Sequence, residues 1–356
     1  MANCLNSSDN ATVYKKFDLS SECTLFDFTV LTVVVGLSCC LGIVGNAVSF
    51  IVLLRDSASV TTFLLQALAV ADTLVLITAA PLFSISPIYY YTGYLKSYTD
   101  LYAVIMPFLW PLYLISYTGT ICLTVLVSLN RYEAVCRPFK ADKLFDGTKV
   151  RRHVFYVALF SVLYNIPRFF EYEKAEVCIG YNSSKETFDI SAFGGNKVYR
   201  ILYTNILYFL VMHGGPLLSL AFLNANLIRA LKVQARKRTE MKMAGYQQDI
   251  TLVLVVVVCV FICCQTPTFV DHILWTVLDK STTTCGHWHY YYTAIGDMLA
   301  ILNSAVNFVI YVLTSPKFRQ NLLSMCVVFS TPRRTSSKPE AILLCPIVKD
   351  YNGETV

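Results

Sequence analysis

Residues 250–278 read ITLVLVVVVCVFICCQTPTFVDHILWTVL and contain one charged residue, Asp271. A helix that crosses a lipid bilayer needs about 20 predominantly apolar residues, so this stretch is long enough to span a membrane. Six further stretches of this kind lie along the chain, at 28–54, 62–88, 101–133, 153–170, 199–228 and 288–314. The sequence therefore predicts an all-α membrane protein, a bundle of seven transmembrane helices.

The composition of the whole chain agrees with this assignment. Of its 356 residues 55% are hydrophobic and only 15% are charged, against roughly 25% charged residues in soluble domains. A water-facing surface needs more charge, which argues against a soluble enzyme. The sequence also contains no His/Cys set with metal-ligand spacing and no nucleophile constellation, so we expect no enzymatic activity.

Lysine and arginine set the orientation, because they gather on the cytoplasmic side of membrane proteins. With the N-terminus outside, 20 of the 29 Lys and Arg residues lie in the cytoplasm. The net charge of +6 is then a cytoplasmic excess, which points to an inner membrane face and not to nucleic acid. Three glycosylation sequons fall on the outer side, at Asn6, Asn10 and Asn182.

The chain divides into three parts on this topology. Residues 1–27 form an extracellular segment, and the membrane domain covers 28–326, with a short amphipathic eighth helix at its end. Residues 327–356 form a cytoplasmic tail, rich in Ser, Thr, Pro and Lys, that we expect to be disordered.

Short polar motifs interrupt the spans in a fixed order. They are Gly45-Asn46, Leu68-Ala69-Val70-Ala71-Asp72, Asn130-Arg131-Tyr132, Pro216, Cys264-Gln265-Thr266-Pro267, Asn303-Ser304, Asn307-Phe308-Val309-Ile310-Tyr311 and Lys317-Phe318-Arg319. Together they resemble the motifs of the rhodopsin-type (class A) G-protein-coupled receptors over roughly 28–326. That resemblance implies a plasma-membrane receptor whose partners are a heterotrimeric G protein, a receptor kinase and arrestin.

Several positions depart from the usual pattern of that family. Asn130 replaces the acid before the arginine of the third span, Gln265 replaces a tryptophan and Phe308 replaces a proline. The stretch Tyr164-Asn165-Ile166-Pro167-Arg168-Phe169-Phe170-Glu171 and the motifs around Gln265 and Asn307 resemble invertebrate FMRFamide-type neuropeptide receptors. The resemblance implies an amidated, RFamide-like peptide ligand. A class A receptor for a lipid or another small molecule is the alternative, and a transporter is a weaker one.

Asp72 lies in the middle of its span, where an ionised carboxylate is costly and needs partners. The polar residues that a bundle would turn toward it are Asn46, Thr120, Asn303, Ser304 and Asn307. One carboxylate among neutral oxygen atoms suits a sodium ion, an allosteric modulator that the resemblance also implies. A hydrogen-bonded network without an ion is the other interpretation. We expect no other metal or cofactor.

The resemblance makes Arg131, Tyr132, Pro267 and Tyr311 parts of an activation switch. A buried Arg131 needs a partner, and Asn130 and Gln247 stand where the family usually has acids. A hydrogen bond to a neutral oxygen is weaker than an ion pair. We therefore expect weaker restraint of the inactive state and higher basal activity.

The ligand pocket is predicted to be aromatic and polar. The position where amine receptors of this class carry an aspartate is Tyr113, so an amine ligand is not expected. The side chains expected to face the cavity are Tyr113, Tyr117, His213, Gln265, Phe269, Asp271, His272, Trp275 and Asp297. Asp297 is expected to pair with the guanidinium of an Arg-Phe-amide ligand, or else with Arg168 or Lys197 at the rim.

Four of the 13 cysteines lie outside, where they can form disulfides: Cys4, Cys23, Cys178 and Cys285. The bridge usual in the family needs a cysteine at Met106, so it is impossible here. Three pairings remain open. The resemblance places the first and seventh spans side by side and so favours Cys23–Cys285, with Cys4–Cys178 as the remainder. Cys326 is expected to be palmitoylated or else free at the membrane edge.

Overall fold

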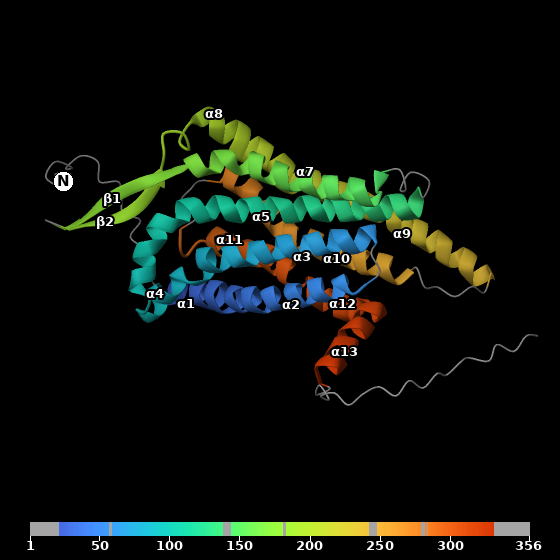
Figure 1. Cartoon of the computed structure of the whole chain (residues 1–356). Helices are drawn as coiled ribbons and strands as arrows, with labels where there is room; N and C mark the ends of the chain where they lie inside the picture. The colour runs from blue at the N-terminus through green and yellow to red at the C-terminus, as the bar shows by residue number, and fades with distance from the viewer. Residues whose placement is uncertain are drawn as a thin grey trace, which may run out of the picture.

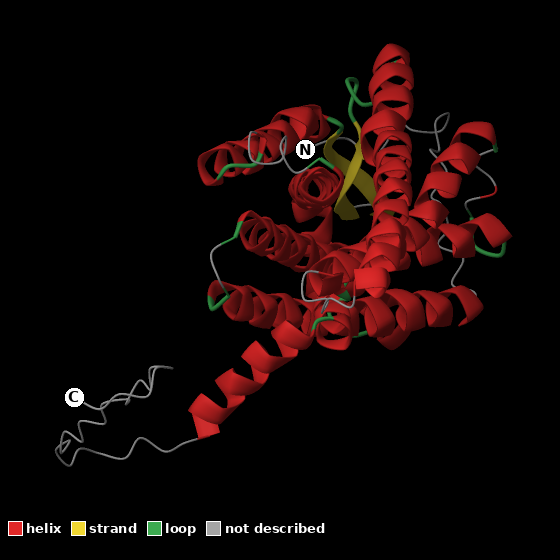
Figure 2. Ribbon diagram, turned by 90° about the vertical axis from the view of Figure 1, so that its right-hand side faces the viewer, coloured by secondary structure: helices red, strands yellow, loops and turns green. Residues whose placement is uncertain are grey.

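The computed structural model describes residues 21–330 apart from 57–58, 138–143, 181–182, 242–247, 279–281 and 283. In that part of the chain, seven helical segments run along one axis, and an eighth helix leaves the bundle at an angle (Figure 1). Viewed after a quarter turn, the segments form a closed bundle (Figure 2). The predicted architecture of a seven-helix bundle is confirmed.

Most of the seven segments combine α-helix with short pieces of other helix, marked η. The first four are α1 Ser21–Asp27, η1 Phe28–Val35 and α2 Gly36–Leu54; α3 Val60–Ala79, η2 Ala80–Ser84 and α4 Ser86–Thr92; α5 Lys96–Cys136; and α7 Gly147–Asn165 with η3 Ile166–Phe170. The last three are α8 Lys197–Tyr199, η4 Arg200–Leu207, η5 Phe209–Gly214 and α9 Gly215–Met241; α10 Gln248–Val277; and α11 Trp288–Ala305 with α12 Asn307–Thr314. The eighth helix is α13 Pro316–Ser330.

Several helices extend beyond the apolar stretches that predicted them. The third segment was expected at 101–133 and runs as α5 from Lys96 to Cys136. The fifth was expected to end at 228, and α9 continues to Met241. A count of apolar residues finds the part of a helix that lies in lipid and not its polar extensions into water.

By length and composition, five of the helices could cross a membrane, or six if the bent pair α11 and α12 counts as one span. The fourth segment, α7, is not among them, and Lys149, Arg151 and Arg152 lie near its start. Long basic side chains at such a helix end extend to the membrane interface, so these residues mark one end of the span.

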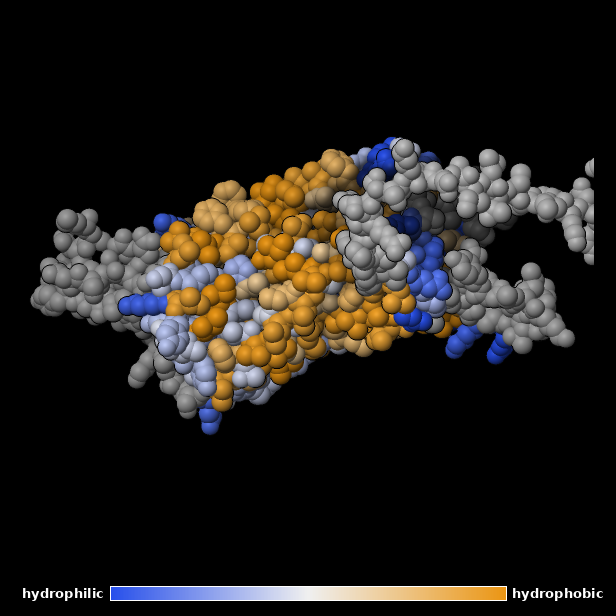
Figure 3. Space-filling model, turned by 60° about the horizontal axis from the view of Figure 1, so that its bottom comes forward, coloured by the Kyte–Doolittle hydropathy of each residue, from blue (hydrophilic) through white to orange (hydrophobic). Residues whose placement is uncertain are grey.

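The outer surface of the bundle is apolar. Large hydrophobic side chains face outward from the middle of the helices, among them Leu41, Phe155, Leu218 and Phe222. In the space-filling view, hydrophobic surface covers much of the middle of the face shown, and hydrophilic residues lie toward both ends (Figure 3). An apolar surface of this extent is not stable in water, and it fits the hydrocarbon core of a bilayer.

The long helix α5 packs against α3, α7 and α9 and so occupies the centre of the bundle. One buried cluster surrounds its outer half, with Ile121, Phe261 and Ile301 at its centre. A second cluster surrounds the cytoplasmic half and includes Leu254 and Tyr311. Polar groups described below lie within and between these two cores.

Helices α2, α3 and α11 approach each other closely at Gly42. A Cβ atom on Gly42 would lie 2.6 Å from Cδ1 of Leu76 and 2.7 Å from Cβ of Ala305. Small residues permit this approach of backbones in membrane bundles. The close packing brings the first, second and seventh segments together around Asp72.

Two strands that the sequence did not predict follow η3. Strands β1 Tyr172–Gly180 and β2 Ser183–Ile190 pair antiparallel, with Tyr172 opposite Ile190 and Lys174 opposite Phe188. The ring of Phe188 packs near Tyr102 on α5, with centroids 6.4 Å apart. The hairpin therefore rests on the outer end of α5, and the bridge usual in the family cannot form there because residue 106 is a methionine.

Candidate functional site

The outer half of the bundle contains an aromatic layer built on α5. Tyr113 and Tyr117 are four residues apart, so they lie on one helix face, and their rings stack 5.6 Å apart at 10°. Trp110 stacks on Tyr113 at 5.8 Å. Both tyrosines are buried, as the sequence predicted for residues that face inward.

Gln265 on α10 is joined to this layer. The Tyr117 hydroxyl donates to Oε1 of Gln265 at 2.6 Å, and the Thr268 hydroxyl approaches the same oxygen at 3.3 Å. The side chain of Gln265 is almost fully buried. Its Nε2 has no hydrogen-bond partner among the described residues. The oxygen of this amide is therefore hydrogen-bonded, and its nitrogen is not.

The outer part of the fifth segment is wound as a π-helix, in η4 and η5. Tyr203, Tyr208 and His213 are spaced five residues apart. In an α-helix, two residues that are five positions apart point in directions about 140° apart around the helix axis. The i to i+5 pattern of a π-helix brings such residues close to one face. This winding lets Tyr208 contact His213 and, on α10, His272, at ring distances of 5.5 and 5.3 Å.

Phe269 completes the aromatic wall between α10 and the fifth segment. Its ring lies 5.4 Å from Phe209 and 6.4 Å from His213. His272 makes a 3.2 Å hydrogen bond to the backbone oxygen of Asn205. His213 is buried and its Nδ1 is without a partner in the described part of the chain.

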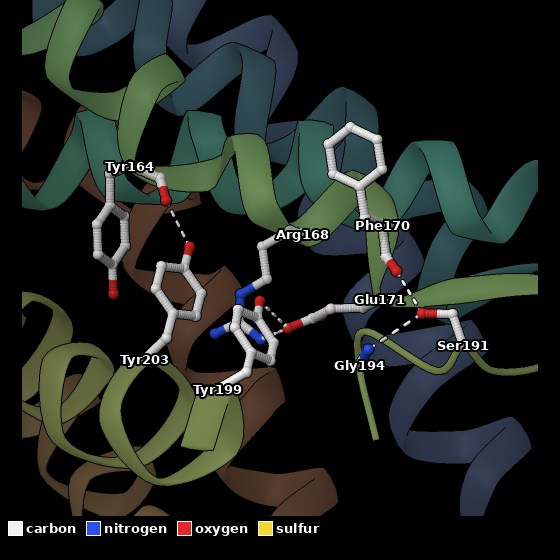
Figure 4. A network of polar contacts seen from close by, with 8 residues as sticks. All are labelled: Tyr164, Arg168, Phe170, Glu171, Ser191, Gly194, Tyr199 and Tyr203. Atoms are coloured by element: carbon white, nitrogen blue, oxygen red, sulfur yellow. Dashed lines mark hydrogen bonds and ion pairs between the residues drawn. The ribbon is translucent and has the colours of Figure 1, made fainter. Parts of the chain in front are cut away.

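A polar network ties the end of the fourth segment to the hairpin and to the fifth segment (Figure 4). Arg168 Nη1 donates to Oε1 of Glu171 at 2.8 Å, and both side chains are more than 90% buried. The Tyr199 hydroxyl donates to the same carboxylate oxygen at 2.7 Å. The Arg168 guanidinium also lies over the rings of Tyr203 and Tyr208, 5.1 Å from each centroid.

Ser191, which follows β2, extends this network at the hairpin through two hydrogen bonds. Its hydroxyl donates to the backbone oxygen of Phe170 at 2.5 Å and accepts from the backbone nitrogen of Gly194 at 3.0 Å. The Tyr203 hydroxyl donates to the backbone oxygen of Tyr164 on α7. Sequence reasoning missed this network, although the (i, i+3) spacing of Arg168 and Glu171 is visible in the chain.

Asp297 on α11 lies beside these aromatic residues. The preceding residue, Gly296, faces α10: a Cβ atom there would lie 3.5 Å from Cγ2 of Thr268. The carboxylate is half-buried, and within the described residues no hydrogen bond or ion pair to it is found. Because Arg168 is paired with Glu171, the expectation that Asp297 might pair with Arg168 is wrong. Lys197, the other rim candidate, is exposed.

Asp271, in contrast, is already engaged by the seventh segment. It accepts from Nε2 of His289 at 3.0 Å and from the Thr293 hydroxyl at 2.8 Å. The sequence missed His289, which is fully buried. Trp275 stacks edge-on against His289 and leaves 49% of its surface exposed. Asp271 and Trp275 therefore tie α10 to α11 at this end of the bundle, and their place among the cavity residues stays a prediction.

Asp72 lies at the centre of the predicted polar cluster and is fully buried. Asn307 Nδ2 donates to its Oδ2 at 2.6 Å, and the hydroxyls of Ser304 and Thr120 face the carboxylate. Asn46 Nδ2 donates to the backbone oxygen of Ser304 at 2.9 Å. Asn303, which was also predicted for this cluster, is buried one residue before Ser304.

This cluster holds buried oxygen atoms that lack partners among the described residues. They are Oδ1 of Asp72, Oδ1 of Asn46, Oγ1 of Thr120, Oγ of Ser304 and Oγ of Ser49; Ser49 was not foreseen. Carboxylate, amide and hydroxyl oxygens are hard donors that suit a hard cation. The residues present therefore fit a sodium ion, which would supply the positive charge that a buried carboxylate requires.

The seventh segment bends by 51° where α11 meets α12. The usual proline is Phe308 here, so proline does not cause the bend. The break lies at Val306, immediately before Asn307, whose side chain reaches Asp72.

At the cytoplasmic end of α5, Arg131 has no charged partner in the described part of the chain, and its buried Nε is unpaired. Oδ1 of Asn130 accepts from the Thr61 hydroxyl at 3.2 Å, so this oxygen joins α5 to α3. Glu133 lies 3.7 Å from Arg137, whose guanidinium covers the Tyr132 ring at 5.4 Å. Gln247, the second expected acceptor, lies outside the described residues.

Helix α13 is held against the end of the bundle. Phe318 packs on Tyr311 with ring centroids 5.6 Å apart, and Lys317 forms an ion pair with Asp56. Arg319 Nη1 donates to the backbone oxygens of Val312 and Leu313, both at 3.1 Å. These contacts satisfy the carbonyl groups that a helix end leaves unpaired.

A disulfide joins Cys23 to Cys285, with Cα atoms 6.2 Å apart, so this predicted pairing is confirmed. Beside it, the Tyr290 hydroxyl donates to Oδ2 of Asp27 at 2.5 Å. Cys4, the sequons at Asn6, Asn10 and Asn182, and the tail lie outside the described residues. The side chains of Cys178 and Cys326 also fall outside them.

Comparison with known proteins agrees with this geometry. The model of the 7 transmembrane receptor (rhodopsin family) matches residues 45–311. The chain is 31% identical over 324 residues to an FMRFamide receptor of Drosophila melanogaster, covering 89% of this chain and 56% of the relative. It is 29% identical to the FMRFamide peptide receptor frpr-18 of Caenorhabditis elegans, covering 88% and 70%, and 25% identical to neuromedin-U receptor 2 of Mus musculus, covering 95% and 85%.

The chain thus spans about half the length of the Drosophila receptor and most of the other two. The family model covers more than half of this chain and includes the polar cluster, the aromatic layer and the bent seventh segment. The chain belongs to the rhodopsin family of seven-transmembrane receptors.

Proposed function

We propose that this chain is a plasma-membrane G-protein-coupled receptor for an extracellular amidated peptide that ends in Arg-Phe-amide. The observation that carries the proposal is Asp297, a half-buried carboxylate without an ion-pair partner in the described residues, set among Tyr113, Tyr117 and Tyr208. A buried charge is costly until it is paired, so this site favours a ligand that brings a cation. The names of the Drosophila and Caenorhabditis relatives agree.

The ligand's arginine would form a charge-assisted pair with Asp297, because guanidinium matches carboxylate in a bidentate geometry. Its phenylalanine would pack among aromatic rings, and the rings of Phe209 and Phe269 lie nearest to each other in that wall. Tyrosine and histidine around them provide contact area with polar edges. A lipid ligand would leave the carboxylate of Asp297 buried and unpaired, which disfavours that alternative.

The signal would pass to the cytoplasm through α10. The Tyr117–Gln265 hydrogen bond joins α5 to α10 two residues before Pro267, where the helix lacks one backbone donor. Ligand contact with the aromatic layer would shift this bond and let the cytoplasmic half of α10 move away from Arg131. A G protein would bind the basic surface that opens, and receptor kinase and arrestin would act on the same face.

The orientation follows from two observations. The disulfide Cys23–Cys285 links the outer ends of the first and seventh segments, and disulfides form in oxidising compartments. Lysines and arginines gather at the other end. We place the N-terminus outside the cell and α13 at the inner face of the plasma membrane.

The test is a panel of amidated peptides, including Phe-Met-Arg-Phe-amide, applied to cells that express the chain. Guanine-nucleotide exchange on G protein is read in membranes, and calcium and cyclic AMP are read in whole cells. We expect at least one peptide with a C-terminal Arg-Phe-amide to act at nanomolar to micromolar concentration. A response to lipids alone, or ion or substrate flux without nucleotide exchange, would overturn the proposal.

A further inference from the structure

Two more unmatched polar groups lie beside Asp297, and they come from different helices. Gln265 Nε2 on α10 and His213 Nδ1 in η5 are both buried and have no hydrogen-bond partner among the described residues. Buried polar groups in folded proteins are almost always paired. When several unmatched groups share one neighbourhood, a ligand with complementary groups is a direct explanation.

Contacts between the helices place these groups near one another. Tyr117 bonds Gln265, Tyr208 contacts His213, and Phe269, one turn along α10 from Gln265, has its ring 6.4 Å from that of His213. On the other side, a Cβ on Gly296 would lie 3.5 Å from Cγ2 of Thr268. This contact places the turn of α11 that carries Asp297 directly against the turn of α10 that carries Gln265.

The orientation of Gln265 is fixed by its neighbours. The Tyr117 hydroxyl donates to Oε1 at 2.6 Å, whereas the Thr268 hydroxyl donates to the backbone oxygen of Gln265 at 2.9 Å and lies 3.3 Å from Oε1. The bond from Tyr117 assigns Oε1 as the acceptor, and Nε2 is left as a donor. Gln265 can therefore offer a ligand a hydrogen-bond donor, Nε2, more readily than an acceptor.

We propose that Gln265 Nε2 donates a hydrogen bond to the carbonyl oxygen of the peptide's terminal carboxamide, next to the arginine subsite at Asp297. The inference rests on the proposed function and deepens it by assigning the residue that reads the C-terminal group. A terminal carboxylate would be placed near the Asp297 carboxylate, and like charges at short distance repel. A neutral carboxamide avoids this repulsion while keeping the acceptor that Gln265 needs.

The experiment is a cycle between a receptor variant and a ligand change. The receptor is tested as wild type and as Gln265→Leu, which keeps the approximate volume and removes the donor. The ligand is tested as Phe-Met-Arg-Phe-amide and as the same peptide ending in 2-phenylethylamide, which lacks the whole carboxamide. Potency in nucleotide exchange is measured for all four combinations, with surface expression and peptide binding as checks that each receptor is folded.

We expect Gln265→Leu to weaken the carboxamide peptide by about tenfold or more, the size of one buried hydrogen bond. The same variant should weaken the 2-phenylethylamide peptide by a clearly smaller factor, because that peptide has no carbonyl to lose and shares only the effect of the lost Tyr117 bond. A purely structural role for Gln265 would weaken both peptides by the same factor, and that result would overturn the proposal.

A second ligand tests whether Gln265 recognises the carbonyl oxygen or the N–H groups of the terminal carboxamide. A terminal methyl ester keeps the carbonyl oxygen and has no N–H to donate, so its coupling with Gln265 should equal that of the carboxamide. Coupling seen with the carboxamide and absent with the ester would contradict donation from Nε2. If Gln265→Leu fails to reach the cell surface, Gln265→Met serves in the same cycle, because methionine adapts to irregular cavities.

The matched control is Thr266→Val, one residue along α10. The Thr266 hydroxyl bonds the backbone oxygen of Ile262 at 2.7 Å, and the residue is exposed. This substitution should leave the potencies of all three peptides unchanged. If no amidated peptide activates the wild-type receptor, the proposed function itself fails. If amidated peptides activate and the cycle shows no coupling, only the assignment of Gln265 fails.

Discussion

The substitution Glu171→Gln tests whether the buried Arg168–Glu171 pair holds the hairpin against the end of the bundle. Both side chains are more than 90% buried and their atoms lie 2.8 Å apart. Removal of one partner from a buried pair costs about 3–5 kcal/mol. Arg168 keeps two tyrosine rings at 5.1 Å, and each cation–π contact contributes about 0.5–2 kcal/mol. We therefore expect a net loss of about 2–3 kcal/mol.

The assay is thermal stability of the purified receptor in nanodiscs, followed by retained binding of labelled peptide. Arg168→Gln and the double variant complete a cycle, and Tyr199→Phe removes only one hydrogen bond to Glu171. Tyr199→Phe should cost about 1 kcal/mol, and the double variant should cost clearly less than the sum of the two single variants. Additive losses, or a Glu171→Gln receptor as stable as wild type, would refute the idea that the Arg168–Glu171 pair holds the hairpin.

Three further outcomes follow from the polar groups and the disulfide. Asp72→Asn should abolish any effect of sodium on agonist affinity, measured by radioligand competition in sodium and in choline salts; an unchanged sodium effect would exclude the site. Asn130→Asp should lower basal nucleotide exchange severalfold by giving Arg131 an ion-pair partner, and unchanged basal exchange would remove that explanation. Cys285→Ser should lower the apparent melting temperature and peptide potency to the same extent as Cys23→Ser, with no further loss in the double variant; unequal or additive losses would contradict the bridge.

Much of the membrane architecture was predictable because it depends on local composition. Runs of apolar residues identify the helices, and basic residues at 149–152 mark one end of α7; that this end faces the cytoplasm stays a prediction. The cluster around Asp72 was also predictable, since an intramembrane carboxylate needs polar partners on neighbouring helices. The pairing Cys23–Cys285 was expected because the resemblance implied that the first and seventh segments are neighbours.

Features that depend on pairing or on winding were not predictable. The hairpin is formed by polar strands without a clear apolar alternation, so the sequence did not distinguish them from a loop. The π-helical winding that aligns Tyr208 with His213 leaves no compositional signal. The partners of charged side chains were also not predictable. Asp271 bonds His289 and Glu171 bonds Arg168, whereas from the sequence alone each of these two acids could equally face a ligand pocket.

The role of Asp297 is the central claim, and a charge-removal cycle tests it most directly. Wild-type and Asp297→Asn receptors are compared with Phe-Met-Arg-Phe-amide and with the same peptide carrying citrulline, a neutral isostere, in place of arginine. We predict that either change alone lowers potency by about 30-fold or more, as for a desolvated charge pair, and that both together lower it little further. Equal effects of Asp297→Asn on the two peptides, or an unchanged dose response, would contradict the account.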